Sequence, residues 1–210
     1  MKNRVTILLI ILFFTLAACE KAIVSSYANN KPDVNNDPEQ ELVEDIDQII
    51  IANDSGKFII TPIAEYSISA RVVSSRSYSR KWTALLSPVD LALVWGKLGD
   101  KKTDNFISYK QRNRWYYYRY NQNCPIDNNY IISHSSNNHI IPSSYNLSIT
   151  LKSIKKNDLV RIEGYLVKVD GFMKNGKVYW GTSTTRNDSG DRSCELIYAK
   201  SIQINDKIYR

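Results

Sequence analysis

The sequence predicts a mainly β fold of α+β type with one or two short helices. Residues 64–73 alternate strictly between apolar and polar side chains, which is typical of a strand that is buried on one face. Residues 158–169 repeat this alternation, and they are followed by an Asp-Gly and an Asn-Gly dipeptide, which are typical of tight hairpin turns. The first 56 residues differ in composition, so we expect a single domain over residues 57–210, long enough for one core and too short for two.

The two alternating segments predict which side chains enter that core. The residues that share the apolar faces are Tyr66, Ile68, Ala70 and Val72 in the first segment and Val160, Ile162 and Leu166 in the second. Asp170-Gly171 and Asn175-Gly176 then favour a hairpin, and a strand is expected to follow within residues 177–185. Residues 194–204 predict the last strand of the domain.

Two segments between these strands favour helices. Residues 87–96 begin with Ser87 as an N-cap and Pro88 at the first helical position, and they end at Gly96, so we expect a helix there. Its body is apolar on all sides, which predicts burial. Residues 146–156 predict a short surface helix with Leu147, Leu151 and Ile154 on its buried face. Strands, a helix and a hairpin in this order suggest a small β-barrel or a strongly bent sheet, with the oligonucleotide/oligosaccharide-binding (OB) barrel as one candidate.

The N-terminus predicts export to the cell envelope. Residues 1–18 combine a charged start with an apolar run that is too short to span a membrane, which is typical of a signal peptide. The run ends in "LAAC", which resembles the bacterial lipoprotein signal and implies that acyl chains such as palmitate are attached to Cys19. Two or more chains anchor a protein stably in a membrane. Glu20, in place of an aspartate, favours the outer membrane and a domain that faces the periplasm.

Charge is distributed unevenly along the mature chain. Residues 19–56 contain nine acidic and two basic residues, and their composition predicts an acidic, flexible tether. Residues 57–210 contain 24 basic and 12 acidic residues. Such an excess attracts anionic partners, so we expect an envelope protein or an anionic polymer as the partner, in addition to the membrane reached through the lipid.

The segment "RNRWYYYRY", residues 112–120, is the candidate binding surface. On a strand, Trp115 and Tyr117 point to one face and Tyr116, Tyr118 and Tyr120 to the other. One face can fill the core, and the other must be covered or used. The predicted binding residues are Arg112, Arg114, Trp115, Tyr116, Tyr118, Arg119 and Tyr120. Such residues also bind single-stranded nucleic acid, but nucleic acid is not an expected partner of an envelope lipoprotein.

The candidate chemistry involves His139 and two cysteines. His139 with Cys194, or with a nearby serine, has the residue types of a base and a nucleophile. No recognised ligand spacing is present, so neither a metal nor another cofactor is expected. In an oxidising compartment Cys124 and Cys194 are expected to form a disulfide, which would remove Cys194 as a nucleophile; the alternative is that Cys194 is a buried free thiol.

Several segments together resemble a group of uncharacterised bacterial exported proteins with the same order of motifs. The segments are "SPVDLALVWG" (87–96), "RWYYYRY" (114–120), "HIIPSS" (139–144), "DLVRIEGYLV" (158–167) and "SCELIYAKSI" (193–202). The resemblance covers residues 60–204 and implies that these segments form one domain. It supplies no activity, substrate or catalytic residue, and Cys124 lies outside it.

Two functions follow from the sequence. The first is a non-catalytic envelope lipoprotein whose basic, aromatic-rich domain binds a partner protein or an anionic envelope component. The alternative is a small periplasmic hydrolase that uses His139 with Cys194 or a nearby serine.

Overall fold

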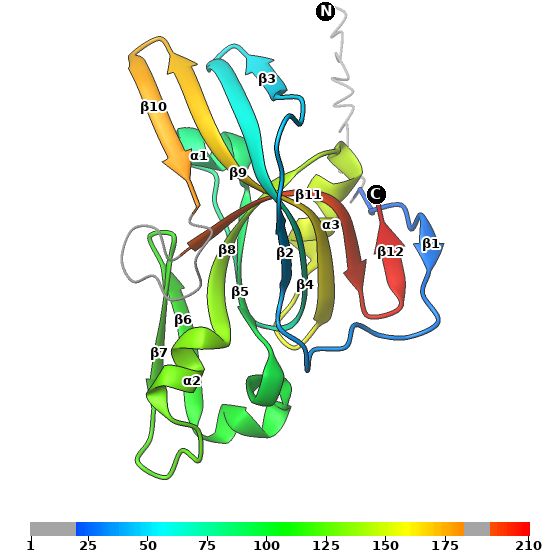
Figure 1. The fold of residues 1–210 in the computed structure, drawn as a ribbon, viewed down its shortest axis with the longest axis vertical. Coiled ribbons are helices and arrows are strands. Elements are labelled where there is room, and N and C mark those ends of the chain that lie inside the picture. Colours follow the sequence, from blue (N-terminus) through cyan, green and yellow to red (C-terminus); the bar gives the residue numbers. More distant parts are fainter. Residues whose placement is uncertain (1–19, 183–193) are drawn as a thin grey trace, which may run out of the picture.

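The predicted mainly β class is confirmed by a computed structural model, which describes residues 20–182 and 194–210 (Figure 1). The strands of this part of the chain are β1 (Ser26–Tyr27), β2 (Glu39–Leu42), β3 (Ile49–Asn53), β4 (Gly56–Ser77), β5 (Val89–Val94), β6 (Ile107–Arg112), β7 (Trp115–Tyr120), β8 (Ser135–Pro142), β9 (Leu159–Met173), β10 (Gly176–Gly181), β11 (Cys194–Ile204) and β12 (Lys207–Tyr209). The helices are α1 (Trp82–Leu86), α2 (Asn128–Ser133) and α3 (Tyr145–Ser153), with the 3-10 turns η1 (Gly96–Gly99) and η2 (Lys101–Asn105). The predicted signal peptide, residues 1–18, and the predicted acylation site Cys19 lie outside the described residues.

Five strands form a closed cycle of pairings at the centre of the fold. Strand β4 pairs antiparallel with β5, β5 with β8, β11 with β9, and β9 again with β4, whereas β8 and β11 are parallel. Helix α3 lies between β8 and β9 in the chain. This connectivity is OB-like. The sheet is strongly curved but not a regular barrel, because β4 and β9 continue together beyond the cycle and β3 and β10 pair with this extension (Figure 1). Strand β2 pairs with the middle of β4, at residues 64–67.

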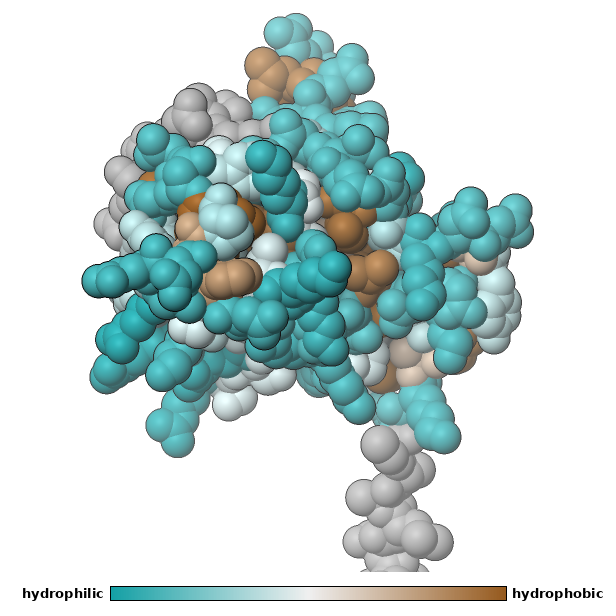
Figure 2. All heavy atoms as spheres, turned by 90° about the horizontal axis from the view of Figure 1, so that it is seen from below, coloured by the Kyte–Doolittle hydropathy of each residue, from teal (hydrophilic) through white to brown (hydrophobic). Residues whose placement is uncertain are grey.

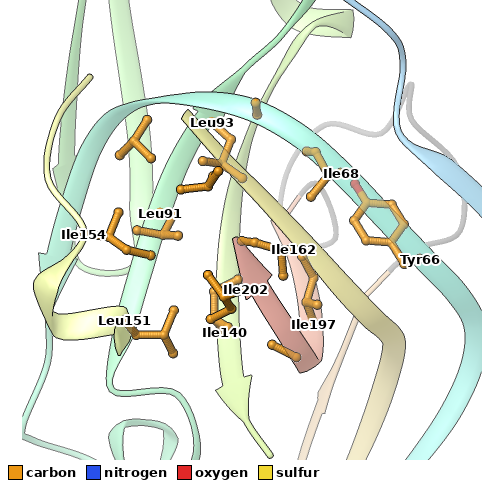
Figure 3. Packing of buried hydrophobic residues seen from close by; sticks show 14 of the residues in the cluster. Tyr66, Ile68, Leu91, Leu93, Ile140, Leu151, Ile154, Ile162, Ile197 and Ile202 are labelled. Carbon is orange, nitrogen blue, oxygen red and sulfur yellow. The ribbon is translucent and has the colours of Figure 1, made fainter. Parts of the chain in front are cut away.

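The main core lies inside the curved sheet. Apolar side chains from its strands and from α3 point toward one another there (Figure 3). All the side chains that the two alternating segments predicted to be buried belong to this core. The predicted surface helix is confirmed as α3, which covers the core with Leu147 and Leu151. Ser144 caps this helix and accepts a hydrogen bond from the backbone N–H of Leu147 at 3.1 Å.

Residues 87–96 are not the predicted helix but contain strand β5, in which every residue is buried. Val89, Leu91 and Leu93 point into the main core, whereas Ala92 and Val94 face a second apolar layer on the other side of the sheet. A short apolar run does not distinguish a buried helix from a central strand, because both are buried on every side. The cap signals at Ser87 and Pro88 were therefore misleading, although the prediction of burial was right.

Residues 20–56, for which the sequence predicts a tether, instead run along the domain. Strand β1 pairs with β12, and β2 and β3 both pair with β4. Ala22 and Val24 pack against the main core, and Ile49 and Ile51 pack against the cluster beneath the β4–β9 extension. The segment is polar overall, but single apolar residues at alternate positions and backbone hydrogen bonds to existing strands are sufficient to place it.

Two smaller layers complete the structure. The β6–β7 hairpin and α2 cover the outer face of β5, and α1 packs on the β3–β4–β9–β10 extension through Trp82 and Leu86. The Asn175-Gly176 hairpin signal is confirmed, with Gly176 at φ 125°, whereas Asp170-Gly171 lies inside β9. None of the helices in the described ranges is long and apolar enough to cross a membrane.

Candidate functional site

A polar cluster lies on the outer face of β5 and β8. Asp90 of β5 and His139 of β8 are direct partners across these antiparallel strands. Their neighbours along the strands point into the main core, so these two side chains point away from it. The turn of the β6–β7 hairpin places Arg114 against them, with Nη1 2.7 Å from Asp90 Oδ1 and Nη2 donating to the Ser87 carbonyl at 2.8 Å.

The cluster is a buried ion pair with an adjacent imidazole. The side chain of Asp90 is 0% exposed and that of Arg114 15% exposed. Burial lowers the pKa of the Arg114 guanidinium, and the Asp90 carboxylate opposes that change. Arginine remains protonated in proteins, so the guanidinium keeps its positive charge in this buried position. His139 Nδ1 is 2.9 Å from the same carboxylate oxygen, but neither this nitrogen nor Asp90 Oδ2 makes a well-aligned hydrogen bond.

Aromatic rings enclose this ion pair. The Arg114 guanidinium lies 4.3 Å from the ring centroid of Tyr78 and 5.3 Å from that of Trp180. The ring of Trp180 also lies 4.9 Å from that of His139 and meets Trp82 of α1 edge-on. Tyr78 accepts a hydrogen bond from the Arg114 backbone N–H, and burial raises its pKa. The rings reduce access of water to the charges, which makes the ion pair costly to break.

The ion pair belongs to a set of contacts that hold the hairpin on the sheet. Asn137 Nδ2 donates to the Arg114 carbonyl at 2.9 Å, and Gln111 Nε2 donates to Asn137 Oδ1 at 2.7 Å. The Tyr116 hydroxyl lies 2.9 Å from Ser135 Oγ, and burial raises the pKa of Tyr116 to about 12. The inner face of the hairpin is therefore fixed by buried polar contacts.

The turn of this hairpin has an unusual backbone. Its two central residues, Asn113 and Arg114, have φ angles of 52° and 67°, as in a two-residue type I′ turn. Asparagine is common in this conformation, but arginine is not. The contacts of the Arg114 side chain offset the cost of this conformation and point the guanidinium inward.

The outer face of the hairpin carries cations and rings and is open to solvent. The side chains that alternate onto this face are Ser108, Lys110, Arg112, Trp115, Tyr117 and Arg119. A hollow of about 820 Å³ lies here, and Arg76 from the end of β4 also lines it. Among the described residues no carboxylate lines this hollow, and Tyr117 is 55% exposed. Figure 2 shows this end of the molecule from below, covered mainly by hydrophilic side chains with small apolar patches between them.

The predicted binding residues separate into two groups. Arg112, Tyr118 and Arg119 line the hollow, Trp115 belongs to the outer face, and Tyr120 is exposed. Arg114 and Tyr116 instead point inward and hold the hairpin on the sheet, so the structure does not place them on the open face with the other predicted binding residues.

Sequence reasoning missed Arg76, Lys110 and Tyr117 as residues of this hollow. The alternation of Ser108, Lys110 and Arg112 in residues 107–112 was the available signal for Lys110. No local pattern linked Arg76 to the hairpin, because Arg76 comes from the far end of β4.

The structure does not assemble the proposed base and nucleophile. Cys194 lies on β11 opposite Asn137, with its Sγ 3.6 Å from Asn137 Nδ2 and 4.0 Å from the Arg114 carbonyl. Within the described ranges, His139 forms no hydrogen bond to a serine, threonine or cysteine. In the same ranges no three His, Cys, Asp or Glu side chains gather closely enough to hold a metal ion.

Cys124 and Cys194 form no disulfide with each other in the structure, which contradicts the predicted bridge. Cys124 packs beneath the hairpin and its thiol contacts the Ile126 carbonyl at 3.4 Å, whereas Cys194 begins a buried strand. Two thiols in one oxidising compartment form a disulfide only where the fold places them together, and this fold assigns each a separate environment.

Comparisons of the chain with protein-family models, with curated proteins and with solved structures gave no match. The proposal for the function is therefore based on the side chains of the β6–β7 hairpin and on the contacts that attach this hairpin to the sheet.

Proposed function

We propose that this protein is a non-catalytic lipoprotein of the bacterial cell envelope that binds an anionic polymer through the outer face of the β6–β7 hairpin. Acyl chains on Cys19 hold it at the outer membrane, with the domain in the periplasm. The observation that carries the proposal is the hollow on this face, where Arg76, Lys110, Arg112 and Arg119 surround an exposed tyrosine and, among the described residues, no carboxylate lines the wall.

The arrangement of side chains supports a polymer rather than a single small anion. Across the two strands, Lys110 lies opposite Tyr117 and Arg112 lies opposite Trp115, so each of these two cations has a ring beside it. An acidic glycan offers a matching repeat, because its carboxylate or phosphate groups pair with the cations while its sugar rings lie against the aromatic rings. Arginine is well suited to such anions because its planar guanidinium binds two oxygens at once.

The rigid attachment of the hairpin to the sheet supports the same function. Ordering a flexible segment on binding costs free energy, which a rigid surface avoids. The inner face of this hairpin is already fixed by the Arg114 ion pair and the Tyr116 hydrogen bond, so the outer side chains share a preformed backbone. Because these outer charges are exposed, binding should weaken as ionic strength rises and the screening length falls below about 8 Å.

The test compares two variants with the same loss of net charge. The first replaces Lys110, Arg112 and Arg119 with serine, and the control replaces three exposed lysines of the β9–β10 hairpin with serine, namely Lys168, Lys174 and Lys177. Binding to a polyuronate and to a neutral polysaccharide of equal length is measured by calorimetry at two salt concentrations. With about 0.2–1 kcal/mol for each of three exposed ion pairs, the first variant should bind the polyuronate about 3-fold to 150-fold more weakly.

Equal losses in both variants would show that only net charge matters and would contradict a specific site. Equal affinity of the wild-type protein for the neutral polysaccharide would contradict an anionic ligand. Single-stranded nucleic acid presents similar chemistry, so an oligonucleotide serves as a further probe. Much tighter binding to the oligonucleotide than to the polyuronate would favour a nucleic-acid ligand instead.

A further inference from the structure

The chain is attached to the domain from its first described residue. The Tyr145 hydroxyl at the start of α3 donates a hydrogen bond to the Glu20 carboxylate. The Ile23 N–H donates to Asn146 Oδ1 at 2.7 Å, and Asn146 Nδ2 donates back to the Ile23 carbonyl at 2.9 Å. Ala22 and Val24 pack against the main core between these contacts. No spacer therefore separates residue 20 from the body of the domain.

The next residues continue this attachment as part of the sheet. Ser26 and Tyr27 form β1 and pair with β12, and the Ser25 N–H donates to the Ile208 carbonyl at 2.8 Å. The Arg210 N–H donates to Ser25 Oγ at 3.1 Å, which joins this segment to the C-terminal residue. Residues 20–27 are thus held along their whole length.

The alternation of this segment gives it an unusual exposed side. Ile23 is 75% exposed and Tyr27 68% exposed, and the ring of Tyr145, which is 69% exposed, belongs to the same region. The cations around them are Lys21, Lys207, which pairs directly with Tyr27, and Arg210, all of them exposed. Apolar and tyrosine side chains with lysine and arginine at their edge are typical of a surface that contacts a membrane interface.

We infer that this N-terminal face, defined as Lys21, Ile23, Tyr27, Tyr145, Lys207 and Arg210, lies directly on the anionic headgroup layer of the membrane that anchors the protein. The inference rests on the proposed acylation of Cys19. Consecutive Cα atoms are about 3.8 Å apart, so acyl chains on Cys19 would hold Glu20 at the membrane surface. Ile23 would follow within about 15 Å of the anchored residue. Anionic lipids attract each nearby cation, and the tyrosines and Ile23 enter the interface.

This orientation restricts what the hairpin can bind. In Figure 1, β1 and β12 lie at the right side of the molecule and the β6–β7 hairpin at the lower left, so the two surfaces are well separated. With the N-terminal face on the membrane, the hairpin would lie away from the membrane surface, in the aqueous periplasm. The headgroups of the anchoring membrane are therefore not the ligand of the hairpin, whereas a periplasmic polymer can reach it.

The first test uses the mature chain without lipid, residues 19–210 with Cys19→Ser, which retains every described core residue. Its partition onto vesicles of phosphatidylglycerol and phosphatidylethanolamine is measured by co-sedimentation. The double variant Ile23→Asp, Tyr27→Asp is compared with Ile50→Asp, Tyr179→Asp, another exposed isoleucine and tyrosine, which lie on the β3–β4–β9–β10 extension. We expect at least a tenfold loss of partition for the first variant and less than a twofold loss for the control. Equal losses, or no partition of a folded wild-type chain, would overturn the inference.

The second test separates this inference from the proposed anchor. Full-length protein is extracted from membranes, its N-terminus is determined by mass spectrometry, and its surface is labelled in vesicles with a tyrosine-reactive reagent. We expect that Cys19 is acylated, that Tyr27 and Tyr145 are protected from the reagent, and that Tyr117 is labelled. Acylated Cys19 with all three tyrosines labelled alike would contradict the N-terminal face alone. A mature N-terminus without acyl groups would contradict the anchor and the inference together.

Discussion

Replacing Asp90 with asparagine is expected to cost the domain much more stability than most single substitutions. Asparagine has nearly the same shape, but it removes the carboxylate that pairs with the Arg114 guanidinium at 2.7 Å. The Asp90 side chain is fully buried and that of Arg114 only 15% exposed, so water cannot take the place of the carboxylate. The substitution therefore leaves a charge with little solvation and no counter-charge.

The magnitude follows from the contacts that remain. Removing one partner of a buried ion pair costs about 3–5 kcal/mol. Arg114 keeps its hydrogen bond to the Ser87 carbonyl and its contacts with the rings of Tyr78 and Trp180, so we expect the lower end, about 3 kcal/mol. In a domain of this size about 1 kcal/mol shifts Tm by about 2–4 °C, which predicts a decrease of about 6–12 °C.

Thermal and urea unfolding, followed by circular dichroism, measure this effect. The control is Asp170→Asn, the same chemical change at an exposed position of β9, which should alter stability by less than about 0.5 kcal/mol. The double variant Asp90→Asn, Arg114→Met removes both charges and should recover most of the loss, because no charge is left unpaired. A loss below about 1 kcal/mol for Asp90→Asn, or no recovery in the double variant, would refute the assignment of a buried ion pair.

Three further outcomes are expected. Gly164→Ala should prevent folding into a soluble domain, as judged by expression and circular dichroism, because the added Cβ would overlap the backbone carbonyl of Tyr198 on β11. The pKa of Tyr116 is raised to about 12 in the folded state, so its contribution to stability is complete below pH 10 and is lost as pH rises through 12. In urea unfolding between pH 10 and 12, the free energy of unfolding should therefore fall less steeply with pH in Tyr116→Phe than in the wild-type protein. Thiol titration of the unfolded, unreduced mature protein should detect two thiols, Cys124 and Cys194, and in the native protein the buried Cys194 should react more slowly.

The parts of the fold that were predictable are those in which apolar residues recur with a clear period. Residues 64–73 and 158–169 alternate because one side of each strand faces the main core and the other does not. Leu147 and Leu151 in α3 follow the helical period for the same reason. In each of these elements the local pattern records the environment directly, so the sequence alone is sufficient.

The elements that were predicted wrongly lack such a one-sided environment. Strand β5 is buried on both faces, so its apolar residues show no period, and its flanking residues resemble helix caps. Residues 20–56 are polar because most of their side chains face solvent, yet their backbone pairs with β4 and β12. Backbone pairing leaves little trace in composition, so no count of charges can reveal it.

The candidate site shows why a cluster of arginines need not have one role. The available signal for a buried cation was Asp90, the single carboxylate within the apolar run of residues 89–94. A buried charge requires a partner of opposite charge. The sequence does not show which arginine pairs with Asp90. Arg114 lies 24 residues further along the chain and reaches Asp90 only because of the type I′ turn. That turn directs Arg114 inward, while Arg112 and Arg119 on the strands point outward. We therefore expect stability and the proposed binding to depend on different arginines of the same nine residues. Removing Arg112 and Arg119 should weaken binding of the proposed ligand with little effect on Tm, whereas removing Arg114 should lower Tm first.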